Sequence, residues 1–536
     1  MLRFLAILTM NTHMKKIHFV YLIIGIKAFL LIDFFIHCSY IDIVEKRETF
    51  MLKVFEQLKT HDEKAINLYH CDSNILMEEA GSALAQVTRE IAYSSEDFYQ
   101  DYKKGFLQKV PRKKTIQIIC GSSDNGGDGL VLARILQDDF NVIAVLPFPP
   151  KSKMCRLQKE RLELLGIKTQ DHIEETCDIL VDSLFGTGFK GNVRPEFLPI
   201  LKQMNEIKAY KIACDVPSGL DIQGIPKEEC FNADLTVCIG ALRAQLFSCF
   251  AKDYVGQIIL KRLPLPTSKY EEETNLFLLQ KEDARIPYRN KQNMNKGSFG
   301  HVCIVSGEKK GASQLAAFSS LIFGAGLVTI SGDDVPFTKA DFMHSNKIIK
   351  EASSIAIGQG LGKENWEVFN EFASFISQSP TTPLVLDADI LSYKKIGYIL
   401  EIASTIVLTP HPKEFKNLLE NTMNLSLSVD EIRKNKIAIM QEFCVKYPNI
   451  ILLLKDCNTF ICSKEKIYIN ALGSVSLSKG GTGDVLTGLI ASCLAQGYSS
   501  LDATITSSIA HAIASHNFKN NYSLTASTLI EEIGKL

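Results

Sequence analysis

The chain has 536 residues, which is too long for a single hydrophobic core. Of these residues 46% are hydrophobic and 22% are charged, which is typical of a globular protein. Its formal net charge of −1 excludes a strongly basic surface, so we expect no nucleic-acid partner. The 14 cysteines form no CxxC pair and no Cys/His cluster at zinc spacing, which predicts buried thiols in a reducing compartment and favours a cytoplasmic protein.

The chain begins with a strongly apolar segment. Residues 18–43 contain the run FVYLIIGIKAFLLIDFFIH, whose length is typical of a signal anchor or a transmembrane helix. Lys27 and Asp33 interrupt this run, and no small-residue cleavage site follows it. A polar helical pattern begins at Met51. Two hypotheses therefore stay open for residues 1–50: an extension outside the functional protein, such as a wrongly placed start, or a membrane anchor.

The next part of the chain, up to about residue 262, alternates short apolar runs with helical patterns. Helices are predicted at Leu130–Asp138 and Lys153–Leu165. Alternation of buried strands and helices predicts a mostly parallel sheet with both faces covered. The predicted strands are Ile116–Cys120, Val142–Leu146, Ile179–Asp182, Ile212–Asp215 and Leu235–Ile239.

The same alternation restarts after a proline-containing, charged stretch at 264–279 that reads as a linker. Long helices are predicted at Ala312–Phe323 and Val485–Gln496. We therefore expect two tandem three-layer α/β domains, at 51–263 and 280–536. The predicted strands of the second are His301–Ser306, Thr329–Ser331, Ser354–Ile357, Leu384–Asp387, Thr405–Leu408 and Ile450–Lys455.

A glycine-rich loop in the first half, GSSDNGGDG at 121–129, follows a predicted strand and precedes a predicted helix. In open α/β sheets ligands bind at the carboxyl ends of the strands, and the glycines suit a backbone cradle for a diphosphate. The spacing is not GxGxxG, so it does not indicate a standard dinucleotide site. A polar strand–helix loop without a ligand is the alternative.

Two further strand ends of the first half carry aspartates. Asp182 leads into FGTGFKG, and Asp215 leads into VPSGLD. If these strands are neighbours, Asn125, Asp182 and Ser218 converge as oxygen ligands suited to a monovalent or alkaline-earth cation. Asp215 is then left as a candidate acid/base group. Each aspartate taken alone is also compatible with a helix cap.

These loops, in this order and preceded by LMEEAG at 76–81, resemble the NAD(P)H-hydrate epimerase family over about residues 52–263. The resemblance implies a Rossmann-like fold that interconverts the R and S epimers of hydrated NAD(P)H without redox change. It implies potassium at Asn125, Asp182 and Ser218, and an acid/base role for Asp215. The implied substrate-binding residues are Asp124, Asn125, Gly126, Gly127, Asp128, Gly186, Thr187, Gly188, Phe189, Lys190, Gly191, Asn192 and Asp215.

The first half departs from the family pattern at two positions. Asp124 stands where the family usually has Asn, which adds a negative charge near the expected diphosphate. Arg243 stands where the family often has Lys, which keeps the positive charge.

The most informative stretch of the second half is KGGTGD at 479–484, which a predicted helix follows. Glycines let the backbone approach a ligand closely, and the free N–H groups of a helix start favour an anion. Asp484 does not suit phosphate binding, so it indicates a base or an orienting group beside a transferred group. A glycine-rich turn whose aspartate caps the helix is the alternative.

Other polar loops of the second half also follow predicted strands. They are GQGLG at 358–362, Asp387–Asp389, and TPHPKEF at 409–415, which contains His411. Lys455–Thr459 lies between two apolar runs and by itself reads as a hairpin turn.

This series of loops resembles the ribokinase-like family of NAD(P)H-hydrate dehydratases over roughly residues 280–534. The resemblance implies that ADP or ATP drives the loss of water from the S epimer, with Mg²⁺ bound through the nucleotide. Asp484 is then the base toward the substrate hydroxyl, and the amides of Gly481–Gly483 stabilise the transferring phosphate. The implied substrate-binding residues are Ala312, Gly360, His411 and Asp484; the implied nucleotide-binding residues are Lys455, Asp456, Cys457, Asn458, Thr459 and Gly483.

Three departures put the activity and the nucleotide preference of this half in question. Asn295 stands where the family tends to have His, and Gln359 replaces Pro. Asp456 replaces the usual Gly after the lysine, which places a charged side chain near the nucleotide.

The order of the two halves resembles the family of bifunctional NAD(P)H-hydrate repair enzymes, with hydrated NAD(P)H and ADP or ATP as partners and K⁺ and Mg²⁺ as ions. Two alternatives stay open: a vitamin or sugar kinase with an accessory domain, and a non-enzymatic binding protein held at a membrane. A homo-oligomer is possible, and a membrane is a partner only if residues 18–43 are an anchor.

Overall fold

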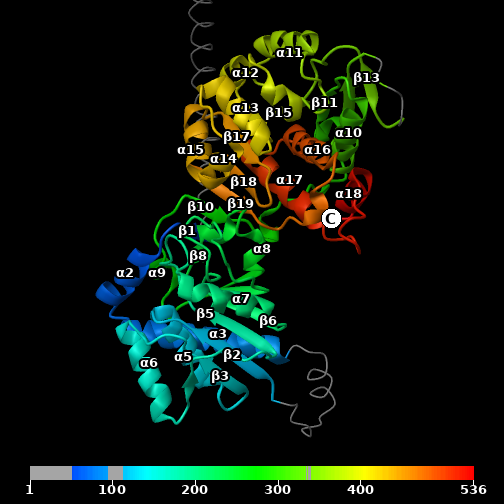
Figure 1. Cartoon of the computed structure of the whole chain (residues 1–536). Helices are drawn as coiled ribbons and strands as arrows, with labels where there is room; N and C mark the ends of the chain where they lie inside the picture. Colours follow the sequence, from blue (N-terminus) through cyan, green and yellow to red (C-terminus); the bar gives the residue numbers. More distant parts are fainter. Residues whose placement is uncertain (1–50, 94–112, 334, 336–339) are drawn as a thin grey trace, which may run out of the picture. The chain divides into compact units, whose positions relative to one another are not determined.

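The computed structural model describes residues 51–93, 113–333, 335 and 340–536 (Figure 1). The apolar segment 18–43 lies outside these residues. Among the residues described, no helix has both the length and the apolar character that a membrane crossing requires.

A parallel seven-stranded sheet forms the centre of the first half. Its strand order, β4-β3-β2-β5-β6-β7-β9, runs outward from β2 in one direction and then from β5 in the other. The switch point between β2 and β5 is where open α/β sheets bind ligands. The strands are β2 (Thr115–Cys120), β3 (Asn141–Val145), β4 (Thr169–Gln170), β5 (Ile179–Ser183), β6 (Tyr210–Cys214), β7 (Leu235–Ile239) and β9 (Gln257–Lys261).

Helices cover both faces of this sheet, as the continuous apolar strands predict. Along β2, Ile116 and Ile118 pack into one core with α3 (Ser73–Tyr93) and α5 (Asp124–Leu136), together with α6 (Lys153–Leu164). Ile119 points to the other face and packs into a second core with α7 (Leu198–Glu206). The alternation follows from the two-residue period of a strand.

Within the described residues, the second sheet has twelve strands in the order β13-β12-β11-β14-β15-β16-β17-β18-β19-β10-β1-β8. Most of them come from the second half, but β1 and β8 at one end belong to the first half. Its first seven strands, β13 to β17 in this order, are parallel and have their switch point between β11 and β14. Strand β18 then pairs antiparallel with both β17 and β19. The strands are β11 (His301–Val305), β12 (Leu327–Ser331), β13 (Met343–Ser345), β14 (Ser354–Ile357), β15 (Leu384–Leu386), β16 (Ile406–Leu408), β17 (Ile450–Leu454), β18 (Thr459–Ser463), β19 (Lys466–Asn470), β10 (Leu276–Leu278), β1 (Leu52–Phe55) and β8 (Leu242–Arg243).

The helices of the second half include α16, which packs against α10, α17 and strands β11, β14 and β15 (Figure 1). It lies in the most apolar part of this half, and every residue from Val485 to Ala495 is buried. The helices are α10 (Lys310–Ile322), α11 (Trp366–Gln378), α12 (Ile396–Ile402), α13 (Pro412–Met423), α14 (Val429–Lys434), α15 (Lys436–Lys446), α16 (Thr482–Ala495), α17 (Ser500–Ala514) and α18 (Ala526–Ile533).

The predicted strands of both halves are confirmed to within a few residues, and the hairpin turn at Lys455–Thr459 joins β17 to β18. The prediction of a glycine-rich loop at 121–129 is wrong in one respect: from Asp124 onward these residues are the first two turns of α5. The predicted linker, 264–279, contains the short helix α9 (Thr267–Tyr270) and β10, which pairs with β19. Cys120, Cys303 and Cys493 are buried free thiols, as expected.

Candidate active sites

Asp182, Ser218 and Asn125 lie together at the switch point of the first sheet. The Ser218 hydroxyl donates to Asp182 Oδ1 over 2.7 Å, and the Ser218 amide donates to Oδ2 over 2.7 Å. The Asn125 amide nitrogen reaches the same place by donating to the carbonyl oxygen of Phe185 over 3.0 Å. The Phe185 amide in turn donates to the Ser218 hydroxyl over 2.8 Å.

The chemistry of this cluster fits a cation with hard oxygen ligands. Burial raises the pKa of Asp182 to about 6, even though hydrogen bonds from Ser218 and Leu184 act in the opposite direction. A buried carboxylate whose charge is so poorly compensated is stabilised when a cation binds beside it. The Ser218 hydroxyl and the Phe185 carbonyl, which hydrogen bonds link to Asp182 and Asn125 respectively, supply further oxygen atoms in this cluster.

The start of α5 is helical although it contains several glycines. Close packing of the backbone requires glycine there. A Cβ at Gly126 would lie 1.8 Å from the carbonyl oxygen of Gly121, so only glycine fits there. Asp124 is exposed in the first turn, where a carboxylate complements the helix dipole. Burial, followed by the charges of Asp215 and Asp124, raises the pKa of Asp128 well above its usual value.

Asp215 occupies a strained turn immediately after β6. Its φ is 67°, the left-handed region that non-glycine residues rarely adopt, and such strain is often found at functional sites. Arg243 binds both of its carboxylate oxygens, with Nε 2.9 Å from Oδ1 and Nη2 2.5 Å from Oδ2. Arg243 therefore holds the Asp215 side chain at two points, and it supplies the positive charge expected at position 243.

The predicted substrate loop Gly186–Asn192 follows β5 directly and is half-buried or exposed. Gly186 lies against Asn125, because a Cβ there would be 3.2 Å from the Asn125 Cβ. The Phe189 ring stacks on Phe185 with 5.2 Å between centroids. The structure thus places the beginning of this loop at the Asn125–Asp182–Ser218 cluster.

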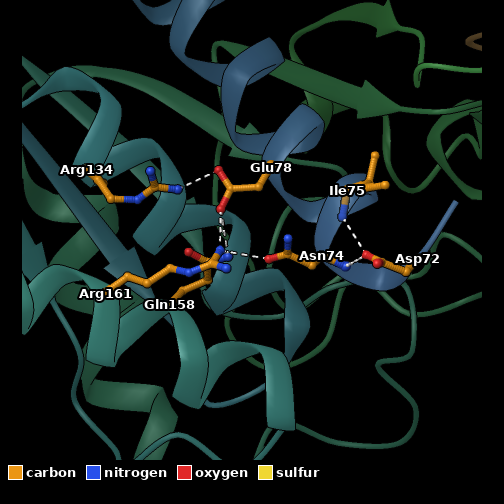
Figure 2. Close-up of polar contacts among 7 residues, drawn as sticks. All are labelled: Asp72, Asn74, Ile75, Glu78, Arg134, Gln158 and Arg161. Carbon is orange, nitrogen blue, oxygen red and sulfur yellow. Dashed lines mark hydrogen bonds and ion pairs between the residues drawn. The ribbon is translucent and has the colours of Figure 1, made fainter.

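Glu78, from the LMEEAG motif, joins α3 to α5 and α6 (Figure 2). Its carboxylate pairs with Arg134 of α5, 2.5 Å away, and with Arg161 of α6, 2.7 Å away. Gln158 donates to the same carboxylate over 3.1 Å. Burial raises its pKa, but the bonds from Arg134 and Gln158 and the two positive charges outweigh burial and lower it. This part of the motif fixes α3 against α5 and α6.

In the second half, Asp387 organises the residues around the start of α16. It follows β15 and accepts from Lys455 Nζ over 2.7 Å and from the Thr487 hydroxyl over 2.8 Å. Gly483 lies beside this pair, since a Cβ there would be 3.4 Å from Lys455 Nζ. The Lys455 ammonium is thereby held at the helix start, where an anion is favoured.

Asp484 lies in the first turn of α16, and burial raises its pKa to about 6. The charges of Asp387 and Asp389 act in the same direction, whereas Lys455 and Lys309 oppose them. A carboxylate of this kind is a better proton acceptor than an exposed aspartate.

The turn before Asp484 is held by Thr482 and His511. The Thr482 hydroxyl donates to the carbonyl oxygens of Leu477 and Lys479, 2.9 Å from each. His511 Nε2 lies 2.9 Å from the Thr482 carbonyl oxygen, and burial lowers the pKa of this histidine to about 4, so it is neutral at pH 7. Gly481 has φ 91°, a conformation that a residue with a side chain rarely adopts.

Gly360 and Ala312 meet at the second switch point, where a Cβ at Gly360 would be 3.1 Å from the Ala312 Cβ. His411 lies at another strand end and caps α13, because its Nδ1 accepts from the amides of Lys413 and Glu414. Its Nε2 lies 3.2 Å from Glu414 Oε1, and half of its side chain is exposed. His411 is thus a cap residue that still presents one ring edge.

The departures in the second half have clear surroundings. Asp456 pairs with Arg433 over 3.3 Å and with Lys436 over 4.0 Å, so its charge is compensated inside the protein. Asn295 lies in a capping box with Ser298. Gln359 is fully buried, and neither polar atom of its side chain has a hydrogen-bond partner within the described part of the chain.

The predicted nucleotide segment Lys455–Thr459 is divided by its contacts. Lys455 faces Asp387, whereas Asn458 turns away and is buried. Its amide nitrogen donates to the Phe247 carbonyl oxygen over 3.0 Å, and its oxygen accepts from Lys252 over 2.8 Å.

Sequence reasoning assigned no role to Asp387, Glu414 or Thr487. Asp387 was visible as a polar residue at a strand end, and Glu414 as the residue three positions after His411. Thr487 carried no signal, because a threonine inside an apolar helix resembles any other core residue. Glu414 lies close enough to Asp387 and Lys455 for their charges to affect its pKa, which burial raises.

Comparison with known proteins matches both halves. A family model described as YjeF-related protein N-terminus matches residues 73–244, and one described as NAD(P)H-hydrate dehydratase matches residues 302–535. The bifunctional NAD(P)H-hydrate repair enzyme Nnr of Helicobacter pylori is 38% identical, over 91% of this chain and 100% of that protein. Nnr of Dictyoglomus turgidum is 30% identical, over 89% and 96%.

Among solved structures, the ADP/ATP-dependent NAD(P)H-hydrate dehydratase from Bacillus subtilis, co-crystallised with ATP/Mg²⁺, is 23% identical, with a TM-score of 0.41. The match covers 48% of this chain and 95% of that one.

Proposed function

The chain belongs to the family of bifunctional NAD(P)H-hydrate repair enzymes, and we propose that its two halves divide the two reactions between them. The first half interconverts the R and S epimers of hydrated NAD(P)H. The second half uses ADP or ATP to dehydrate the S epimer to NAD(P)H. The observation that carries this division is that each half has its own aspartate near a positively charged side chain. Asp215 lies at a strand end and pairs with Arg243. Asp484 lies at a helix start, where the charge of Lys455 acts on it.

In the first half, we assign Asp215 as the acid/base group. Exchange at the hydrated carbon moves a proton or water and transfers no electrons, so a carboxylate held in place by Arg243 suffices. The substrate would lie along the start of α5 and the loop Gly186–Asn192.

We assign Asn125, Asp182 and Ser218 as the residues that hold K⁺. A monovalent cation there would compensate the buried Asp182 and fix the loop that begins at Phe185. Exchanging K⁺ for a large organic cation such as tetramethylammonium should lower epimerisation and leave dehydration of the pure S epimer unchanged. Equal epimerisation in both salts would remove this assignment.

In the second half, Asp484 accepts the proton of the substrate hydroxyl while a phosphoryl group is transferred to its oxygen. Lys455 and the amides of Gly481–Gly483 stabilise the charge on that group, and Mg²⁺, bound with the nucleotide, would neutralise the remaining phosphates. Phosphate is a better leaving group than hydroxide, so elimination then restores NAD(P)H. Ala312, Gly360 and His411 would contact the substrate.

The test is recovery of the reduced-nicotinamide absorbance from mixed R and S hydrated NADPH, with ADP and with ATP in separate reactions. We expect complete recovery, because epimerisation supplies the S form as it is consumed. Recovery of neither epimer contradicts the function of the second half, and recovery of the S fraction alone contradicts that of the first.

The free buried thiols among the described residues further favour a reducing compartment such as the cytoplasm.

A further inference from the structure

Lys252 belongs to the first half of the chain but contacts two segments of the second half. It is the first residue of the short helix α8 (Lys252–Val255), and its side chain is half-buried. Its Nζ donates to Asn458 Oδ1 over 2.8 Å and to the Ala471 carbonyl oxygen over 3.2 Å. A single ammonium group of the first half thus joins two points of the second.

Two groups of the first half fix the side-chain amide of Asn458. Its nitrogen donates to the Phe247 carbonyl oxygen over 3.0 Å, and its oxygen accepts from Lys252. A lysine ammonium only donates and a carbonyl oxygen only accepts, so these partners allow one orientation of the amide. Asn458 is 2% exposed, so loss of Lys252 would leave a buried oxygen without its donor.

The two points that Lys252 contacts lie at one end of a strand pair. Asn458 precedes β18, and Ala471 follows β19. The residues next to them, Thr459 and Asn470, are opposite each other in the antiparallel ladder. Lys252 therefore ties the turn between β17 and β18 to the chain that leaves β19.

Both of these segments adjoin the anion site of the second half. The turn begins with Lys455, whose Nζ is bound to Asp387 and lies beside Gly483. The chain that leaves β19 leads into Gly481, the residue before α16. A turn that is already held in place loses less conformational entropy when a ligand binds to it. A contact that fixes this turn from outside should therefore raise its affinity for a nucleotide.

We propose that Lys252 is a positioning residue for the nucleotide site of the second half. By holding Asn458 and Ala471, it keeps the turn Lys455–Thr459 in the conformation that binds the adenylate of ADP or ATP. The inference rests on the dehydratase function proposed for the second half. The first half then contributes to the affinity for the co-substrate of a reaction that the second half carries out.

The test measures the Kd of the full chain for ADP and for ATP, each with Mg²⁺, by calorimetry. The variants are Lys252→Met, Asn458→Ala and the double variant. We expect each single variant to raise the Kd about tenfold, as loss of a hydrogen bond that leaves a buried partner unpaired predicts. The double variant should lose less than the product of the two single losses, because the two residues share one hydrogen bond.

Steady-state dehydration of the pure S epimer gives a second measurement. In Lys252→Met the KM for the nucleotide should rise by the same factor as the Kd, while kcat at saturating nucleotide and the rate of epimerisation stay unchanged. Lys211→Met is the matched control, because Lys211 is a half-buried lysine that donates to the Asn205 carbonyl oxygen inside the first half. It should leave the Kd for both nucleotides unchanged.

A purely structural lysine would lower the Tm of Lys252→Met and leave its Kd for both nucleotides at the wild-type value, and that result overturns the proposal. Equal weakening in Lys211→Met overturns it too, and so does a joint loss of epimerisation and nucleotide binding, which would indicate general damage to the fold. Losses that multiply in the double variant would overturn the link between Lys252 and Asn458. If the wild-type chain binds neither ADP nor ATP, the proposed dehydratase function itself fails, and the inference fails with it.

Discussion

The two sites place an aspartate beside a cation in opposite ways. In the first half, Arg243 contacts both oxygens of Asp215, which fixes this carboxyl group in a strained turn. In the second half, Lys455 is bound to Asp387, and Asp484 is left with a pKa that burial raises to about 6. Asp215 directly follows strand β6, whereas Asp484 lies in the first turn of α16.

This difference suits two kinds of proton transfer. A group that exchanges protons reversibly needs a fixed position, which a two-point ion pair supplies. A base that takes a proton during phosphoryl transfer needs basicity, which partial desolvation supplies. Under the proposed roles, Lys455 would be available to the phosphate, since Asp387 and not Asp484 positions it.

Replacing each of the two aspartates in turn with asparagine tests this comparison most directly. Asp484→Asn should lower dehydration of the S epimer by about 10²–10⁴-fold, because the hydroxyl proton loses its acceptor, and should leave epimerisation unchanged. Asp215→Asn should do the reverse. Both rates are measured on each variant, with pure S epimer for dehydration. Loss of both activities in either variant would contradict the division of the reactions between the halves.

A lysine substitution sharpens the role of the second cation. Lys455→Met should lower dehydration by about 10²–10³-fold, because charge that develops on the transferring phosphate loses its partner. Lys479→Met is the matched control, since Lys479 lies on the same turn but donates to the Tyr522 carbonyl oxygen. A control variant as impaired as Lys455→Met would show that the loss is not specific to Lys455 and would contradict its role at the transferring phosphate.

The pH dependence of dehydration should reflect the raised pKa of Asp484. Below about pH 6 the carboxyl group is protonated and cannot accept the hydroxyl proton, so the rate should fall about tenfold for each further pH unit. Above pH 6 the rate should be level. Single-turnover rates between pH 4.5 and 8, with thermal unfolding followed in the same buffers, separate this effect from unfolding. A rate that is level down to pH 4.5 would exclude Asp484 as the base.

The sequence predicted the strands and their polar ends well because apolar runs and glycine loops are local signals. It failed at Asp124–Gly129, where glycine has low helix propensity but close packing of Gly126 on Gly121 makes a helix form. It also assigned no role to Asp387. This residue depends on Lys455, a partner 68 residues further along the chain that only the fold brings beside it.

The smallest effect concerns Glu78, which supports the first site without touching it. Its ion pairs with Arg134 and Arg161 involve side chains that are 23–34% exposed, so solvent weakens them. Glu78→Gln should therefore lower the free energy of unfolding by only about 1–2 kcal/mol. Thermal inactivation of epimerisation in the full chain measures this loss.

Glu90→Gln, on the same helix α3 but in a surface contact with Gln86, is the matched control and should change little. Because Glu78 holds α3 against α5 and α6 and lies far along the chain from Asp484, inactivation of epimerisation should shift to lower temperature while dehydration persists. Parallel loss of both activities would mean that α3, α5 and α6 support the whole chain and not the epimerase site alone.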